Sequence, residues 1–229
     1  MTTSQQNRSK QAAGEAAAEL VQSGMLVGLG TGTTAEYFIQ ALSKKCREGL
    51  QIKAVATSSK SLELAKKGHI PLADLNSLLS LDITVDGADE IDPKKRMIKG
   101  GGGALLREKI IAHMSKEMVV IVDSSKVVSA LGKFPLPLEI SPFAWRATLY
   151  AVQQAGYQGA LRQNPEGHTF ITDNGNYIFD MSLPFPCLFP EKIEESLQQI
   201  PGILQTGFFF NLARKVIVGH PDGNVEFQS

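Results

Sequence analysis

The sequence predicts an α/β protein with a parallel, Rossmann-like sheet covered by helices on both faces, together with a smaller ferredoxin-like α+β domain. In the first half of the chain, short apolar runs alternate with helix-like segments, which is the pattern of a parallel sheet. The alternation stops near Leu131, where Phe134-Pro135-Leu136-Pro137 interrupts it. After this point the expected order is βαββαβ, which is typical of ferredoxin-like domains.

The N-terminal half supplies the expected parallel sheet. Its expected helices are residues 10–22, 33–47, 59–67 and 103–114, and its expected strands are residues 25–29, 52–56, 81–85 and 118–122. Gly68 follows the third of these helices, where glycine commonly ends a helix. Because strands and helices alternate, neighbouring strands are expected to run parallel.

The second half supplies the smaller domain. Its expected strands are residues 136–140, 157–162, 169–183 and 203–209, and its expected helices are residues 143–154 and 191–199. A turn is expected at Asp173-Asn174-Gly175-Asn176. Two further strands, residues 215–219 and 225–227, are expected to return to the first sheet. We therefore expect an α/β catalytic domain of residues 1–131 and 205–229 and a ferredoxin-like domain of residues 132–204.

Composition narrows the class of protein. The chain has 229 residues, with 23 Lys and Arg against 23 Asp and Glu. This balance argues against a general nucleic-acid or anionic-membrane binder, which needs a basic excess. Cys46 and Cys187 fit no metal or redox spacing. The first nine residues are polar, and no apolar run approaches the roughly 20 residues of a membrane span. We expect a cytoplasmic protein.

A glycine-rich turn follows the first expected strand. Gly28-Leu29-Gly30-Thr31-Gly32-Thr33-Thr34-Ala35 leads from strand to helix, where free backbone N–H groups and the positive helix end suit a phosphate. The turn also matches the dinucleotide pattern G-x-G-x-x-A. That interpretation requires an acidic residue after the second strand, where Thr57-Ser58-Ser59 stands. These hydroxyls suit a phosphate or a sugar, although a purely structural turn is also possible.

Acidic residues follow the third expected strand in Val85-Asp86-Gly87-Ala88-Asp89-Glu90-Ile91-Asp92. Asp86 and Asp89 bracket two small residues at a strand's carboxyl end, where open α/β sheets bind ligands. Helix capping and a magnesium site are the alternatives. The four histidines show no metal spacing, and Glu90 and Asp92 are expected to be solvated.

Four consecutive glycines form the third feature, in Lys99-Gly100-Gly101-Gly102-Gly103. Such a run is entropically costly and suits a nest of N–H donors around an anion or a developing oxyanion. Lys99 supplies a movable positive charge. Glu108 lies about one and a half turns into the following helix, where it either enters the site or is an ordinary surface acid.

Together these segments resemble the type A ribose-5-phosphate isomerase family. The resemblance runs in order through GLGTGTTAEYF, VDGADEID, MIKGGGGALLREKI and VDSSKVVSALGKFPLPLEI, with weaker similarity at TDNGNYIFD and IPGILQTGFF. It implies a metal-independent aldose–ketose isomerase, commonly a homo-oligomer and most simply a homodimer, that interconverts ribose 5-phosphate and ribulose 5-phosphate without a cofactor.

The resemblance also implies roles for residues. Glu108 corresponds to the proton-transferring base, and Asp86, Asp89 and Lys99 complete the catalytic set. The implied substrate-binding residues are Thr31, Gly32, Thr33, Thr34, Gly87, Ala88, Gly100, Gly101, Gly102, Lys126 and Lys10. A coenzyme A transferase with an attacking glutamate and a sugar-phosphate sensor are the rival classes. A transferase would need an acyl-CoA, which the threonine-rich turn does not suggest. A sensor would usually lack the acids and carry a DNA-binding segment.

Overall fold

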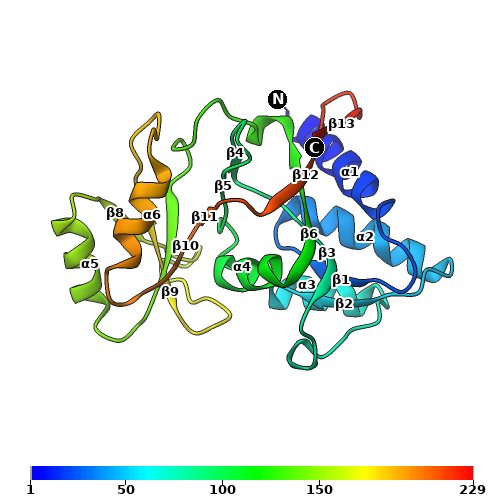
Figure 1. Cartoon of the computed structure of the whole chain (residues 1–229), viewed down its shortest axis with the longest axis horizontal. Helices are drawn as coiled ribbons and strands as arrows, with labels where there is room; N and C mark the ends of the chain where they lie inside the picture. The colour runs from blue at the N-terminus through cyan, green and yellow to red at the C-terminus, as the bar shows by residue number, and fades with distance from the viewer. Residues whose placement is uncertain (1, 229) are drawn as a thin grey trace. The chain divides into compact units, whose positions relative to one another are not determined.

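The computed structural model describes residues 2–228, and the chain divides into two compact units (Figure 1). Unit 1 comprises Met1–Ala88, Arg107–Val127 and Asn211–Ser229, and unit 2 comprises Asp89–Leu106 and Val128–Phe210. Unit 2 includes residues 89–106, 128–131 and 205–210, which we expected in the larger domain, and the domain limits at residues 131 and 204 stay predictions.

Unit 1 is built on a six-stranded sheet in the order β13-β12-β6-β3-β1-β2. Its strands are β1 (Leu26–Leu29), β2 (Lys53–Ala56), β3 (Leu81–Asp86), β6 (Ser115–Asp123), β12 (Ala213–Gly219) and β13 (Val225–Gln228). All neighbours pair in parallel except β13, which is antiparallel to β12.

Helices cover both faces of this sheet. The helices are α1 (Thr3–Ala18), α2 (Thr33–Arg47), α3 (Ser59–Lys67) and α4 (Leu105–Met114). Val27 and Ala54 pack in one buried cluster with Phe38 of α2, whereas Val55 packs in another with Ile111 of α4. Successive residues of β2 therefore enter different clusters, as they must in a strand buried on both sides. The expected fold class is confirmed.

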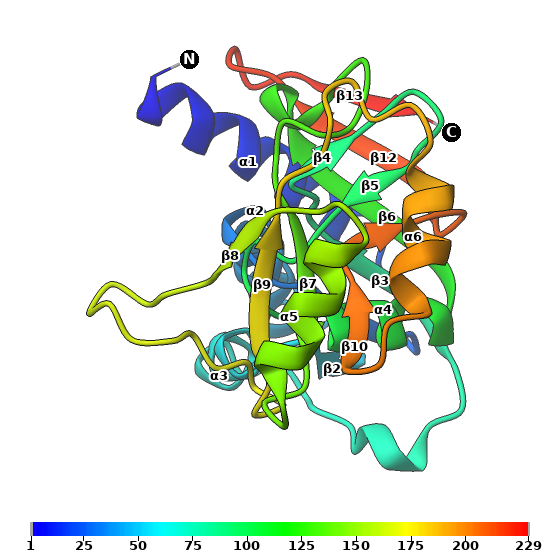
Figure 2. The ribbon, with the colours of Figure 1, turned by 90° about the vertical axis from the view of Figure 1, so that its left-hand side faces the viewer.

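Unit 2 contains a four-stranded antiparallel sheet in the order β10-β7-β9-β8. Its elements follow one another as β7 (Leu136–Ile140), α5 (Trp145–Gln154), β8 (Gly159–Leu161), β9 (Tyr177–Met181), α6 (Pro190–Gln198) and β10 (Ile203–Thr206). Leu138 and Phe179 of the sheet share a buried cluster with Val152 of α5 and Leu197 of α6. This is the expected ferredoxin-like βαββαβ arrangement (Figure 2).

The expected strand at residues 203–209 is two strands in two sheets. After β10, Gly207 intervenes and β11 (Phe208–Phe209) joins a three-stranded sheet with β5 (Met97–Ile98) and β4 (Glu90–Ile91), in the order β11-β5-β4. A Cβ at Gly207 would lie 2.4 Å from the carbonyl oxygen of Lys99, so only glycine allows this close approach. The two-residue strands β4 and β5 are too short to show a periodic signal.

Several element ends differ from those expected. Helix α1 begins at Thr3 rather than at residue 10, because Thr2 and Gln5 form a capping box. Helix α4 begins at Leu105 rather than at residue 103, since Gly103 has a φ of +76°. Only Tyr177–Met181 of the expected strand 169–183 forms a strand. Two short 3₁₀ segments, Leu75–Ser77 and Ser124–Lys126, complete the chain. Within residues 2–228, no helix combines the length and the apolar character that crossing a membrane requires.

Candidate active site

The glycine-rich turn lies at the point where the order of the parallel strands reverses. From β1 the chain passes through α2 to β2 on one side, and then returns to β3 on the other side of β1. Open α/β sheets bind ligands at such a switch point, outside the carboxyl ends of the strands. Gly30 to Thr34 follow β1 there, and on the neighbouring strand Asp86 is the last residue of β3 and Gly87 follows it.

Asp86 holds the two neighbouring turns together. Its Oδ1 accepts N–H hydrogen bonds from Thr31 at 2.9 Å and from Gly87 at 2.7 Å. The residue is only 2% exposed. A Cβ on Gly30 would lie 2.2 Å from the same carboxylate oxygen, so glycine at position 30 is what lets Asp86 approach.

Hydroxyl groups after β2 hold the same turn from another side. The Thr57 hydroxyl donates to the Leu29 carbonyl at 3.1 Å and lies 2.6 Å from the Thr31 hydroxyl. The Ser61 hydroxyl donates to the Gly30 carbonyl at 2.6 Å. Ser58 caps α3. We expected the hydroxyls of residues 57–59 to suit a phosphate or sugar, but Thr57 and Ser58 are buried and bond within the protein.

The start of α2 carries amides that suit an anion. Gly32 is the N-cap residue, with a φ of +104° and no side chain to cap the helix. Among residues 2–228, no acceptor is found for the amides of Thr33 and Thr34. Thr31, by contrast, uses its amide on Asp86 and its hydroxyl on Thr57. The groups of this turn that suit a phosphate are therefore those of Gly32 to Thr34, where the helix dipole is positive.

Glu108 is buried in the first turn of α4. Its exposed fraction is 5%, so the interpretation of this residue as a surface acid is wrong. Burial of a carboxylate is costly unless the group is paired or hydrogen-bonded, and Glu108 lies in a helix that packs against the sheet through Ile111. It fits a proton-transferring base, which works best where water is excluded.

The glycine loop, which we define as Gly100–Gly103, belongs to unit 2 and is held by Asp89. The Gly101 amide donates to Asp89 Oδ2 at 2.7 Å, and the Gly103 amide donates to the Gly100 carbonyl at 2.9 Å. Within the described part of the chain, only Gly100 and Gly102 of this loop keep amides without an acceptor. The expected nest of donors is thus narrowed to two amides.

Lys99 is buried at the entrance of the glycine loop. It is 2% exposed, and its amide donates to the Gly207 carbonyl at 2.8 Å. Its Nζ lies 5.4 Å from the centroid of the Phe209 ring, which is a cation–π distance. A buried positive charge of this kind suits an oxyanion, and the expected catalytic role of Lys99 stays a prediction.

Two acids that we expected to be solvated are buried. Glu90 accepts the amides of Gly132 at 2.8 Å and Phe134 at 2.7 Å. Asp92 pairs with Arg96, whose Nη2 lies 2.6 Å from Asp92 Oδ2. Both carboxylates stabilise the backbone of unit 2. The partners of Glu90 lie more than 40 positions away in the sequence, whereas the partner of Asp92 lies in a local turn.

The two lysines assigned to the phosphate lie on different elements of unit 1. Lys126 ends the 3₁₀ segment after β6, which is capped by the side chain of Asp123. Lys10 lies on α1 and is half-buried. The assignment of Lys10 and Lys126 to substrate binding stays a prediction.

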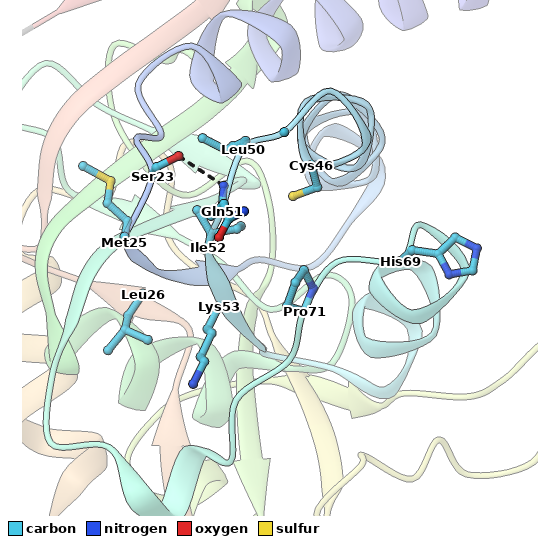
Figure 3. A pocket seen from close by; sticks show the side chains of 12 residues that line it. Ser23, Met25, Leu26, Cys46, Leu50, Gln51, Ile52, Lys53, His69 and Pro71 are labelled. Carbon is cyan, nitrogen blue, oxygen red and sulfur yellow. Dashed lines mark hydrogen bonds between the residues drawn. The ribbon is translucent and has the colours of Figure 1, made fainter.

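A separate cavity of about 880 Å³ opens at the opposite ends of the parallel strands, where β1 and β2 begin (Figure 3). It is lined at the amino-terminal starts of β1 and β2 by Leu26 and Lys53, and by Cys46 of α2. Burial raises the pKa of the Cys46 thiol, which makes it a poor nucleophile. Because ligands of open α/β sheets bind at the carboxyl ends of the strands, we do not assign the active site to this cavity.

The residues described contain no cluster of three or more His, Cys, Asp or Glu that would hold a metal ion.

The fold and the site define a class of α/β proteins with a glycine-rich turn at the switch point, whose helix amides suit an anion, and with a buried carboxylate at Glu108. Comparisons with known proteins agree with this class. The family model of ribose 5-phosphate isomerase A (phosphoriboisomerase A) matches residues 53–223. A ribose-5-phosphate isomerase A of Protochlamydia amoebophila is 51% identical over 94% of this chain and 93% of its own length.

Solved structures give the same result. Ribose 5-phosphate isomerase A of Methanocaldococcus jannaschii is 37% identical with a TM-score of 0.90, over 96% of this chain and 97% of that one. A D-ribose-5-phosphate isomerase in complex with phospho-erythronic acid is 38% identical with a TM-score of 0.90, over the same shares of both chains. The chain belongs to the ribose 5-phosphate isomerase A family.

Proposed function

We propose that this isomerase interconverts D-ribose 5-phosphate and D-ribulose 5-phosphate by moving one proton between C2 and C1 through an enediolate. The observation that carries the proposal is the burial of Glu108 within the family's matching segment. Glu108 removes the proton from C2 of the open-chain aldose and returns it to C1. A carboxylate suits this task because it accepts and donates the same proton without leaving its place.

The enediolate oxygens need positive partners. We assign this task to the buried charge of Lys99 and to the amides of Gly100 and Gly102, which have no acceptor among the described residues. One donor of this kind is worth about 3 kcal/mol in comparable sites. The base itself supplies roughly 10²–10⁴ in rate.

The remaining site residues are assigned by the chemistry they offer. The amides of Gly32 to Thr34, the hydroxyls of Thr33 and Thr34, Lys126 and Lys10 hold the phosphate, and Thr31 supports the turn from behind. The uncapped start of α2 supports this assignment. Asp86 assists ring opening or moves the hydroxyl proton between O1 and O2. Asp89 orients the substrate hydroxyls or Lys99, with Gly87 and Ala88 leaving room for the sugar.

The variant Glu108→Gln tests the proposed base. Turnover should fall by about 10²–10⁴, because the amide cannot accept a proton. The inhibition constant of inorganic phosphate should stay within about twofold of that of the original protein, since the group that holds phosphate is unchanged. Glu63→Gln, on the exposed side of α3, is the matched control and should leave turnover unchanged. Near-normal turnover of Glu108→Gln would remove Glu108 from its role.

Isotope exchange reports on the same step. In heavy water, ribulose 5-phosphate formed from ribose 5-phosphate should carry solvent deuterium at C1, and Glu108→Gln should lose exchange together with turnover. The rate should not respond to a chelator. A rate that a chelator abolishes and magnesium restores would instead favour a metal-assisted hydride shift.

We further propose that the protein works in the cytoplasm in the pentose phosphate pathway, as a homo-oligomer and most simply a homodimer. Phe185, Leu188 and Phe189 of unit 2 are exposed apolar side chains within five residues, which supports contact with a second copy. Light scattering that gives the mass of a single chain would contradict the dimer.

A further inference from the structure

Arg162 holds the glycine loop by its carbonyl groups. It follows β8 in unit 2, its side chain is 14% exposed, and no motif in the sequence marks it. Its Nη1 donates to the Gly100 carbonyl at 2.9 Å and to the Gly101 carbonyl at 3.1 Å. One guanidinium nitrogen therefore binds two successive carbonyls of the loop.

Because peptide units are planar, the contacts made by the carbonyl groups also determine where the N–H groups point. In a trans peptide the C=O and the following N–H point in opposite directions. The peptide between Gly100 and Gly101 is held at both ends, by Arg162 at its oxygen and by Asp89 at its N–H. The next peptide has its oxygen on Arg162, so the N–H of Gly102 points away from Arg162. Within residues 2–228 this N–H has no acceptor.

Arg162 is itself fixed in a single geometry. Its Nε and Nη2 form a two-pronged pair with Asp180 of β9, at 2.9 and 2.5 Å. Its guanidinium lies 5.7 Å from the centroid of the Phe170 ring. The Phe170 amide donates to the Arg162 carbonyl at 2.8 Å, and a Cβ on Gly103 would lie 2.5 Å from the Phe170 ring. Phe170 thus packs on both Arg162 and the loop that Arg162 holds.

We propose that Arg162 is a positioning residue that aims the Gly102 amide at the enediolate oxygen, with Asp180 and Phe170 holding Arg162. The inference rests on the proposed function, because it concerns the oxyanion of that reaction. Arg162 does not touch the substrate. Its positive charge on the two carbonyls also polarises the peptides and makes the Gly102 N–H a stronger donor.

Arg162→Lys provides the test, because lysine keeps the charge but cannot bind two carbonyls and both oxygens of Asp180 together. We expect kcat to fall by about 10–100-fold, part of the 10²–10³ that a lost oxyanion donor costs. The KM for ribose 5-phosphate should change by less than about twofold, because the oxyanion exists only after proton removal.

The affinities for two inhibitors distinguish a change in the direction of the Gly102 amide from a general loss of structure in the site. Phospho-erythronic acid carries a planar carboxylate, which resembles the two enediolate oxygens, and its affinity should fall by a factor similar to that of kcat. The affinity for inorganic phosphate should stay unchanged. Arg146→Lys, an exposed arginine of α5, is the matched control and should leave all four quantities unchanged.

Asp180→Asn is the second variant, since it leaves Arg162 in place but weakens the pair that holds it. It should lower kcat and the affinity for phospho-erythronic acid in the same direction, by a smaller factor. The inference is overturned if Arg162→Lys keeps kcat within twofold, or if the affinities for phosphate and phospho-erythronic acid fall together. If the unsubstituted protein has no isomerase activity, the proposed function is overturned instead, so the two failures are distinguishable.

Discussion

Gly30 and Gly87 flank the same buried carboxylate but differ in the room around them. A Cβ on Gly30 would lie 2.2 Å from Asp86 Oδ1 and 2.5 Å from Asp86 Cα. A Cβ on Gly87 would find its nearest atom at 3.7 Å, which is an ordinary contact. The two glycines therefore have different reasons to be present, although both belong to the same site.

We expect Gly30→Ala to lower the free energy of unfolding by about 1–3 kcal/mol, because the backbone must move to admit the methyl group. Gly87→Ala should change it by less than about 0.5 kcal/mol. Urea denaturation followed by circular dichroism measures both. Equal effects of the two substitutions would mean that Asp86 does not set the position of the turn.

At the scale of elements, the segment between β8 and β9 is organised by one buried acid. Figure 2 shows this segment as a long loop leaving the small sheet. Glu139 of β7 is fully buried, and its Oε1 accepts hydrogen bonds from Thr172, Asn174 and Asn176 at 3.0, 2.9 and 2.8 Å. The turn expected at residues 173–176 is thus attached to the central strands, next to the segment that carries Phe170.

Glu139→Ala should lower the stability of the protein by about 2–4 kcal/mol, since it leaves three donors without their acceptor. Glu139→Gln keeps one carbonyl oxygen and should cost less. Glu195→Ala, an exposed acid of α6, is the control. Chemical denaturation measures the difference, and a Glu139→Ala protein as stable as the control would show that the turn does not depend on this carboxylate.

At the scale of the whole molecule, Asp82 couples the stability of the parallel sheet to pH. It lies on β3 and accepts the amide of Leu26 on β1 at 2.8 Å and the ammonium of Lys116 on β6 at 2.7 Å. These bonds, first that of Leu26 and then that of Lys116, lower the pKa of Asp82 below its usual value. Three adjacent strands are therefore joined by a carboxylate that must be ionised.

A lowered folded-state pKa contributes stability that is present above the unfolded-state pKa, about 3.9, and is lost as the pH falls through the folded-state value. We expect Asp82→Asn to reduce the free energy of unfolding at pH 7 by about 0.5–1 kcal/mol, since the pair is partly exposed. The difference from the original protein should be smaller at pH 2 than at pH 7, because the carboxylate becomes protonated as the pH falls. Denaturation curves at both pH values measure it, and a loss that is the same at pH 2 would contradict the linkage.

Local sequence determined a large part of this molecule. The helices Thr33–Arg47 and Ser59–Lys67 and the strand Leu136–Ile140 lie where apolar periodicity and turn residues predict them. The family and the isomerase class, which the resemblance of short motifs implied, are confirmed. The domain limits at residues 131 and 204 and the roles of the site residues stay predictions.

Only the tertiary structure decided which groups hold the site. Asp86 binds Thr31 across 55 positions of sequence, and Arg162 binds Gly100 across 62. The strand expected at residues 203–209 is divided at Gly207 into two strands that belong to different sheets. Glu90 and Asp92 look like solvated acids in the sequence but are buried. Periodicity reports which face of a segment is apolar, whereas the partner of a buried polar group depends on how distant segments pack.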